Sequence, residues 1–303
     1  MKEFANLHCH TQLSDGSERP ISFLKKAARY TRYCAITDHN RLISSDEMFL
    51  WSHAVPEVTL VPGAEMSALY RPDSWSEDIE VHILTLLYTP GKTPHLDSIA
   101  QENQNNNRRE YVNSILNKLR TECGLAEVGS YDDLRAEFPN ITHIGRTTIA
   151  RHLVNKQYVR NVEEAFYLYF GDRGLQRAFV KNPTNFAPMD RVVQAALADG
   201  AVPVLAHLFT YTKLTEQEQE VLVRRFREMA GDHPAGLEVF YYRYYHDPAL
   251  IKKLQNLADR YNLLPSCGSD FHDLQNDTLN PGFPAEIYLN LFSAHQNYYR
   301  TQR

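Results

Sequence analysis

The stretch NLHCHTQLSDG, residues 6–16, places two histidines one residue apart close to the start of the chain. Side chains at positions i and i+2 of a strand point to the same face. If the stretch is extended, His8 and His10 aim at one point while Cys9 faces the opposite way. Asp15 follows in Ser-Asp-Gly, which is typical of a turn. A single His-x-His pair can be accidental, so the rest of the chain must show whether it forms a site.

Short apolar runs alternate with amphipathic segments over most of the chain. The apolar runs predict strands at 34–40, 58–67, 81–88, 201–208, 236–242 and 263–272, with a turn before Glu65 inside the second. The amphipathic segments predict helices at 21–33, 188–200 and 247–262. Strands that alternate with helices are typical of a parallel sheet or barrel, so we expect an α/β fold.

One long segment departs from this alternation. Residues 97–186 are polar and helical in pattern and contain no convincing strand. We therefore expect a helical insertion at 97–186, which caps the substrate and divides an α/β barrel into a first part, 1–96, and a second part, 187–303.

The composition is that of an ordinary globular protein. The chain has 303 residues, of which 43% are hydrophobic, and a formal net charge of −5. This charge argues against a broad nucleic-acid-binding surface. We find no apolar run that reaches the roughly 18 residues of a membrane span, and no apolar stretch of a signal peptide at the start. Four cysteines are widely spaced without C-x-x-C, so neither a disulfide framework nor a zinc–thiolate site is expected, and the cytoplasm is the expected compartment.

Histidines and carboxylates recur where the predicted strands stop. In a β/α barrel the carboxyl ends of the strands form one rim, where active sites lie. Buried groups of this kind are costly unless they are paired or bind metal, so together they predict a metal cluster. Imidazole and carboxylate ligands suit Zn²⁺, Mn²⁺ or Fe²⁺. The candidate ligands are His8, His10, Asp15, His39, Glu65, His82, His207, Asp270 and His272.

The charge of such a cluster indicates the kind of substrate. Three carboxylates contribute −3, whereas three divalent ions would contribute +6. The positive surplus favours an anionic substrate such as a phosphate group.

The motifs HCHTQLSDG, ITDHN, GAE, VHIL, AHL and GSDFH resemble, in this order, those of the polymerase and histidinol phosphatase (PHP) superfamily. The segments GRTTIARHLV, FYLYFGDRG, FVKN and LEVFYYRY resemble the branch of stand-alone bacterial nucleoside 3′,5′-bisphosphate phosphatases and a small-RNA exonuclease. The resemblance implies a distorted (β/α)₇ barrel with three divalent metal ions at the strand ends. It also implies hydrolysis of phosphate esters by a hydroxide that bridges two metals.

The resemblance also assigns ligands to each metal. The first metal would be held by His8, His10, Glu65 and Asp270. Glu65 would bridge to a second metal, which His82 and His207 also hold. Asp15, His39 and His272 would hold the third. The chain departs from the usual motifs at Leu208, where a proline is common, and at Thr148, where a histidine is frequent.

Basic and hydroxyl residues in the insertion are candidates for binding the rest of the substrate. Arg146, Thr148 and Arg151 lie in the GRTTIAR turn and its helix, where an arginine fork and amide groups suit phosphate. Arg173, Arg177 and Lys181 form a weaker second cluster that suits a second phosphate, but they are at least as well interpreted as loop charges. His246, after an aromatic run that suits either core packing or base stacking, is a candidate outer hydrogen-bond partner or leaving-group acid.

Small phosphorylated metabolites are the expected substrates, most specifically nucleoside 3′,5′-bisphosphates or short oligonucleotides. A cyclic phosphate phosphodiesterase and a histidinol phosphate phosphatase would use the same site, although the insertion disfavours the latter. A metal-dependent amidohydrolase also begins its barrel with H-x-H, but the Asp270/His272 pair and Asp15 weigh against it. A non-catalytic, metal-stabilised module is a further alternative. The sequence defines neither the metal nor the oligomeric state.

Overall fold

Seven strands in chain order form a nearly closed barrel, which confirms the predicted fold class. The computed structural model describes residues 3–105, 108–139, 141, 144–171, 174–180, 186–273, 279 and 282–301. The strands are β1 (Ala5–Asn6), β2 (Tyr33–Ile36), β3 (Thr59–Tyr70), β4 (Ile79–Leu86), β5 (Val202–Leu205), β6 (Gly236–Tyr241) and β7 (Leu264–Gly268). The first and last strands lie side by side, since the amide of Leu7 donates to the carbonyl of Cys267 at 3.0 Å.

One strand runs against the others. β4 is antiparallel to β3 and to β5, whereas the other neighbouring pairs are parallel. The connection between β3 and β4, residues 71–78, is too short for a parallel crossover, which needs a dozen or more residues. The barrel is therefore mixed, with one antiparallel strand among the parallel strands that the alternation of strands and helices predicts. His82 lies inside β4, opposite Ser67 of β3, and not after the end of a strand.

The predicted turn before Glu65 is wrong, because β3 continues without interruption from Thr59 to Tyr70. A Cβ atom on Gly63 would lie 2.9 Å from Cγ2 of Thr37 and 3.1 Å from Cδ2 of Leu86. Glycine is therefore the residue that lets this strand pass between its neighbours. As a result Glu65 is held in the middle of a strand, with regular backbone pairing to β4 on one side and an isolated bridge to His39 on the other.

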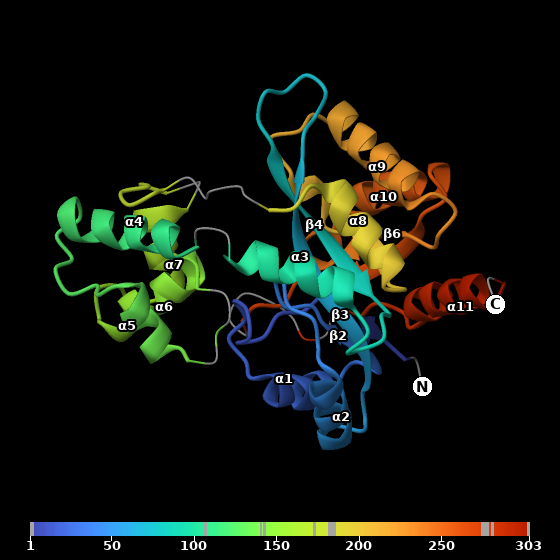
Figure 1. Ribbon diagram of the computed structural model, residues 1–303, viewed down its shortest axis with the longest axis horizontal. Coiled ribbons are helices and arrows are strands. Elements are labelled where there is room, and N and C mark those ends of the chain that lie inside the picture. Colours follow the sequence, from blue (N-terminus) through green and yellow to red (C-terminus); the bar gives the residue numbers. More distant parts are fainter. Residues whose placement is uncertain are drawn as a thin grey trace.

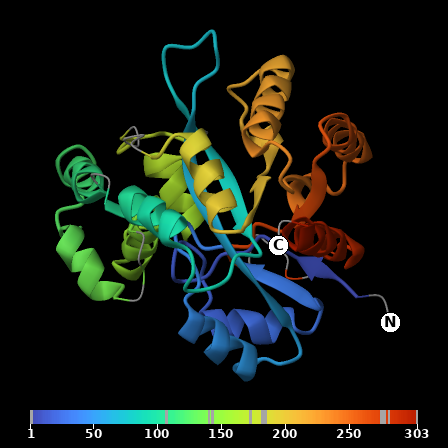
Figure 2. The same ribbon diagram turned by 45° about the vertical axis from the view of Figure 1, so that its right-hand side comes forward.

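Helices cover the barrel and build the insertion (Figures 1 and 2). Around the barrel they are α1 (Pro20–Ala27), α2 (Ser45–Ala54), α3 (Pro94–Asn105), α8 (Met189–Ala198), α9 (Glu216–Ala230), α10 (Pro248–Arg260) and α11 (Glu286–Thr301). In the insertion they are α4 (Arg108–Thr121), α5 (Tyr131–Glu137), α6 (Arg146–Asn155), α7 (Val162–Ala165) and the π-helical turn η1 (Phe166–Phe170). Short 3₁₀ turns are η2 (Leu208–Thr210) and η3 (Tyr242–Tyr244).

The first helix is shorter than the predicted span 21–33. It ends at Ala27, because Tyr33 already pairs with Ala5 of β1 and Thr59 of β3 as the first residue of β2. Pairing in the barrel thus overrides the helical pattern of the last residues. Elsewhere the helix ends follow local signals: the hydroxyl of Thr215 accepts from the amide of Glu218 at the start of α9, a capping box.

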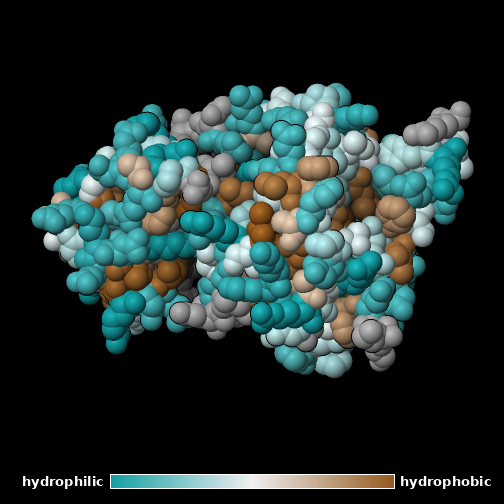
Figure 3. Space-filling model, turned by 90° about the horizontal axis from the view of Figure 1, so that it is seen from below, coloured by the Kyte–Doolittle hydropathy of each residue, from teal (hydrophilic) through white to brown (hydrophobic). Residues whose placement is uncertain are grey.

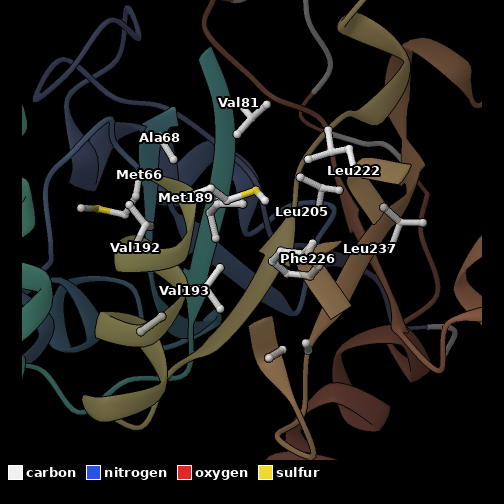
Figure 4. Packing of buried hydrophobic residues seen from close by; sticks show 14 of the residues in the cluster. Met66, Ala68, Val81, Met189, Val192, Val193, Leu205, Leu222, Phe226 and Leu237 are labelled. Carbon is white, nitrogen blue, oxygen red and sulfur yellow. The ribbon is translucent and has the colours of Figure 1, made fainter. Parts of the chain in front are cut away.

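The barrel and the insertion have separate hydrophobic clusters. In the barrel, side chains of β3, β4, β5 and β6 meet those of α8 and α9, among them Met66, Val193, Leu205 and Phe226 (Figure 4). A second cluster fills the insertion between α4, α5, α6 and η1. The insertion helices lie together on one side of the barrel (Figure 1). Within the described part of 97–186 there is no strand.

Polar residues cover most of the surface seen in Figure 3, with hydrophobic residues gathered in separate patches. Exposed large hydrophobic side chains include Phe49 and Leu50 of α2. No helix among the described residues is both long and apolar enough to cross a membrane.

The end of β7 predicts a stability effect. A Cβ on Gly268 would lie 2.1 Å from Cβ of His8 and 2.6 Å from Oε1 of Glu238. Gly268→Ala should therefore lower the free energy of unfolding by about 1–3 kcal/mol through overpacking. Urea unfolding measures this. The matched control is Gly124→Asn, at a left-handed position with open space around it. Equal midpoints for Gly268→Ala and the wild type would contradict this account of the packing.

Candidate metal centre

All nine candidate ligands lie at one end of the barrel, although they come from six of its seven strands or from the loops that follow them. His8, His10 and Asp15 follow β1, and His39 follows β2. Glu65 and His82 stand inside β3 and β4. The remaining candidates follow β5 and β7, namely His207, Asp270 and His272. Because β4 is reversed, the beginning of this strand lies beside the carboxyl ends of its neighbours.

The carboxylate of Glu65 lies at the centre of this cluster and is 1% exposed. Its Oε2 lies 3.3 Å from Nε2 of His8 and 3.2 Å from Nε2 of His10. The same oxygen is 3.2 Å from Nδ1 of His39. His8 and His10 thus point together, as the extended stretch predicts.

The second oxygen of Glu65 faces a different pair of imidazoles. Oε1 lies 2.8 Å from Nδ1 of His82 and 3.1 Å from Nε2 of His207. These two ring nitrogens are 3.3 Å apart. One carboxylate therefore has imidazoles on both of its oxygens, which is the arrangement of a bridging ligand.

Two aspartates extend the cluster. Oδ1 of Asp270 lies 3.4 Å from Nε2 of His8 and 3.1 Å from Nε2 of His10. Oδ1 of Asp15 lies 3.3 Å from Nε2 of His272, and its Oδ2 lies 3.6 Å from Nε2 of His39.

Three groups of these side chains have ligand atoms within 4.8 Å of one another. They are His8, His10, Glu65 and Asp270; His10, Asp15, His39 and His272; and His39, Glu65 and His82. The groups share His10, His39 and Glu65. Such donors, without thiolate, suit Zn²⁺, Mn²⁺ or Fe²⁺.

Hydrogen bonding supports a cation at this place. Nε2 of His8, Nε2 of His10 and Oε2 of Glu65 are buried and have no hydrogen-bond partner within the described part of the chain. Buried polar atoms of a folded protein nearly always have a partner. Three such atoms that face one another fit a bound cation, which accepts lone pairs from imidazole and carboxylate alike.

The charged side chains of the cluster shift one another's pKa values. Burial alone would raise the pKa of the Glu65 carboxyl, yet the imidazoles of His82 and His39 hold it well below its usual value. Burial disfavours the charged form of His272, but the carboxylates of Asp15 and Asp270 raise its pKa to about 10. The carboxylate form of Glu65 and the protonated form of His272 are therefore both stabilised by their neighbours in the cluster.

Three carboxylates outside the predicted ligand set support the cluster, two by contact with a ligand and one through a loop. Oε1 of Glu238, in β6, lies 2.9 Å from Nδ1 of His8. Oε1 of Glu80 lies 3.2 Å from Nε2 of His82. Asp38 accepts hydrogen bonds from the amide and hydroxyl of Thr11, which shapes the loop that carries Asp15. A glutamate inside the apolar run GLEVF was the one available signal for Glu238.

The insertion contributes to two cavities beside the cluster. The first, of about 240 Å³, is lined by Asp15, His39 and His82 on one side and by Arg146, Thr147 and Thr148 at the start of α6 on the other. The second, of about 400 Å³, is lined by Asp15, His272 and Arg151. Three rings, those of Tyr111, Phe166 and Phe186, also line the first.

Three of the predicted substrate-binding residues make hydrogen bonds within the protein. Nη1 of Arg146 donates to the carbonyl of Phe170 at 3.2 Å, and Nη2 of Arg151 donates to the carbonyl of Asp15 at 2.6 Å. The hydroxyl of Thr148 accepts from the amide of Gly145 at 3.4 Å and so caps α6.

Other predicted residues lie away from the cluster or outside the described residues. Arg177 is exposed, and its charge acts on Cys123 in the insertion. His246 is exposed and contacts the rings of Tyr242 and Tyr245. Arg173 and Lys181 lie outside the described residues. In the aromatic run, Tyr241 and Tyr244 are buried in the barrel cluster.

Comparison with known proteins gives relatives over most of the chain. No protein-family model matches. The chain is 28% identical over 269 residues to a 5′-3′ exoribonuclease of Haemophilus influenzae, covering 88% of this chain and 89% of that protein. It is 29% identical over 273 residues to a 3′,5′-nucleoside bisphosphate phosphatase of Chromobacterium violaceum, covering 88% and 86% respectively.

Solved structures share the fold. One is a protein of Bifidobacterium adolescentis assigned as a metal-dependent phosphoesterase, with a TM-score of 0.74 and 23% identity. Another is an amidohydrolase of Chromobacterium violaceum, with a TM-score of 0.70 and 24% identity. Each comparison covers 96% of both chains. The ordered motifs, the seven-stranded barrel and the curated relatives together support assignment of this chain to the PHP superfamily.

Proposed function

We propose that the nine residues hold three divalent metal ions and that the protein hydrolyses phosphate monoesters of nucleotides. It is a phosphoric ester hydrolase, as its relatives are. The observation that carries the proposal is the position of Glu65, with a buried Oε2 that lacks a hydrogen-bond partner in the described residues and is shared between two of the three ligand groups. A shared, buried carboxylate suits several neighbouring ions better than a single one.

We assign a set of ligands to each ion, with Glu65 common to two of the sets. His8, His10 and Asp270 surround one side of Glu65, and His82 with His207 surround the other. Asp15, His39 and His272 complete the third group. When bound, divalent ions lower the pKa of water and neutralise the charge of phosphate oxygens. Protein side chains then need only hold and orient the substrate.

The first cavity suits a nucleotide that carries more than one phosphate. Its polar floor contains proposed ligands, while Arg146 and the first turn of α6 offer a guanidinium and amide groups for a second phosphate. The rings of Tyr111, Phe166 and Phe186 offer faces on which a base can stack. Together with the curated relatives, this cavity supports nucleoside 3′,5′-bisphosphates or short oligonucleotides as the substrates.

The test of the function is phosphate release with Mn²⁺ from adenosine 3′,5′-bisphosphate, AMP, a cyclic ribose phosphate, histidinol phosphate and a short RNA. The bisphosphate or the RNA should be preferred. A preference for the cyclic ester or histidinol phosphate would retain the metal centre but exclude this substrate class. No release from any of them, with metal bound, would contradict phosphoester hydrolysis.

Metal binding should release protons at neutral pH. Burial disfavours charge on His8, but the carboxylates of Glu238 and Glu65 raise its pKa well above the usual value, and that of His272 is about 10. The His272 imidazole is thus protonated at pH 7 and must lose a proton to ligate, and the raised pKa of His8 acts in the same direction. Affinity should fall about tenfold per pH unit for each proton released as the pH is lowered. Calorimetry with Mn²⁺ in buffers of different ionisation enthalpy measures this, and a buffer-independent enthalpy would contradict it.

Removal of one imidazole tests the site itself. His207→Ala should lower kcat by more than about 100-fold, because loss of a ligand should exceed the effect of losing an outer partner. The control is His53→Ala, at an exposed histidine of α2 that bonds the carbonyl of Phe49. Circular dichroism confirms folding of both variants. Substantial turnover by metal-loaded His207→Ala would remove this residue from the site.

Arg146 should bind the phosphate that is not cleaved. Arg146→Ala should raise KM for the bisphosphate about tenfold or more, through loss of a charged hydrogen bond, with a smaller effect on AMP. Arg109→Ala is the control, because Arg109 is an exposed insertion arginine paired with Asp132. Steady-state kinetics measures both. Equal increases in KM for the two substrates would exclude a specific second-phosphate contact.

A further inference from the structure

A buried glutamate behind the cluster contacts both sides of it. Glu238 is the third residue of β6 and is 0% exposed. Its Oε1 lies 2.9 Å from Nδ1 of His8, and its Oε2 accepts from the backbone amide of His207 at 2.8 Å. His8 and His207 face opposite oxygens of Glu65. One carboxylate thus reaches two separate parts of the centre.

The contact with His8 determines which ring nitrogen is free. Glu238 is an acceptor, so Nδ1 of His8 carries the hydrogen that it donates. A neutral imidazole has one hydrogen, and Nε2 is then left with its lone pair. That nitrogen faces Oε2 of Glu65 and Oδ1 of Asp270. The proton on Nδ1 therefore makes Nε2 available to a metal ion.

The contact with His207 acts on the backbone. His207 has φ +30° and ψ 52°, the left-handed region that residues other than glycine seldom adopt. Its amide is held by Glu238, and its carbonyl accepts from the hydroxyl of Thr210 at 2.8 Å. These bonds keep the residue in this conformation, in which Nε2 lies 3.1 Å from Oε1 of Glu65.

Simple packing does not account for a glutamate at this position. A fully buried carboxylate costs several kcal/mol of desolvation, whereas an apolar side chain of similar volume would not. Among the described residues its hydrogen-bond partners are His8 and His207, both of which belong to the cluster. The Cα of Gly268 lies close beside it, because a Cβ there would meet Oε1 at 2.6 Å.

We propose that Glu238 is a positioning residue that fixes the proton of His8 on Nδ1 and the backbone conformation of His207. Through these two contacts it orients metal ligands on both sides of Glu65. The inference rests on the proposed metal centre. It predicts that Glu238 acts on metal affinity at both sides of Glu65 without touching an ion or the substrate.

Glu238→Gln is the direct test, because it keeps the shape and removes one acceptor. If the amide oxygen faces His207, the amino group faces Nδ1 of His8 and favours the tautomer with hydrogen on Nε2. If the side-chain amide is reversed, its amino group faces the backbone N–H of His207, and two donors meet without an acceptor. Either way one contact is lost, and affinity for at least one Zn²⁺ or Mn²⁺ ion should fall about 10–100-fold.

Asp199→Asn is the matched control. The Asp199 carboxylate is 2% exposed and, like Glu238, accepts from a backbone amide, that of Leu96, while its Oδ1 lies 2.7 Å from a histidine ring nitrogen. It lies away from the nine candidate ligands, in the turn after α8. Asp199→Asn should keep the wild-type metal affinity whatever its effect on stability.

Two readouts, metal titration and NMR, decide the proposal. Titration against a competing chelator should show the loss of affinity in Glu238→Gln only. Nitrogen-15 NMR of the Zn²⁺-loaded wild type should show His8 with hydrogen on Nδ1 and metal on Nε2, assigned with a His8→Asn variant. Wild-type affinity in folded Glu238→Gln, or Nδ1 of His8 bound to metal in the wild type, would overturn the role of Glu238. A wild type that binds no metal would instead overturn the proposed centre.

Discussion

Burial of the Glu65 carboxylate is the constraint on which the rest of the site depends. A carboxylate at 1% exposure costs several kcal/mol unless its oxygens meet compensating charge. Here the compensation comes from imidazoles that follow three different strands or stand in a fourth. Burial of Glu65 therefore requires the barrel to bring these histidines, which are far apart in sequence, to the two oxygens of its carboxylate. The same convergence gives the donor set that a group of divalent cations requires.

The reversal of β4 solves a geometric problem of this convergence. Because β4 is reversed, its first residues, among them His82, lie beside the second half of β3, which carries Glu65. In the antiparallel pair, Glu65 stands opposite Leu84 and Ser67 stands opposite His82, so His82 is a diagonal neighbour of Glu65. Diagonal neighbours in a pair lie within reach of long side chains. A short connection is then sufficient, and the imidazole is held by regular strand pairing instead of by a loop.

Much of the site is predictable from the sequence, because its signals are local. The spacing of His8 and His10, repeated by Asp270 and His272, and the apolar run before each ligand need no knowledge of neighbours. What could not be predicted depends on partners distant in sequence. The direction of β4 is set by its pairing, the straight path of β3 by contacts of Gly63, and the role of Glu238 by His8 at the other end of the chain. None of these contacts produces a periodic pattern in the sequence from which it could be predicted.

The insertion and the barrel are joined where the chemistry takes place. Arg151 of α6 donates to the carbonyl of Asp15, and the side chain of Asp15 is a proposed ligand. The first turn of the same helix carries Arg146 and Thr147 into the cavity above His39 and His82. Because Arg146 and Arg151 stand on the same helix, the hydrogen bond to Asp15 links the loop of this ligand to the groups that we propose to bind phosphate. One hydrogen bond and one helix therefore connect the proposed phosphate-binding groups with the proposed third ligand group.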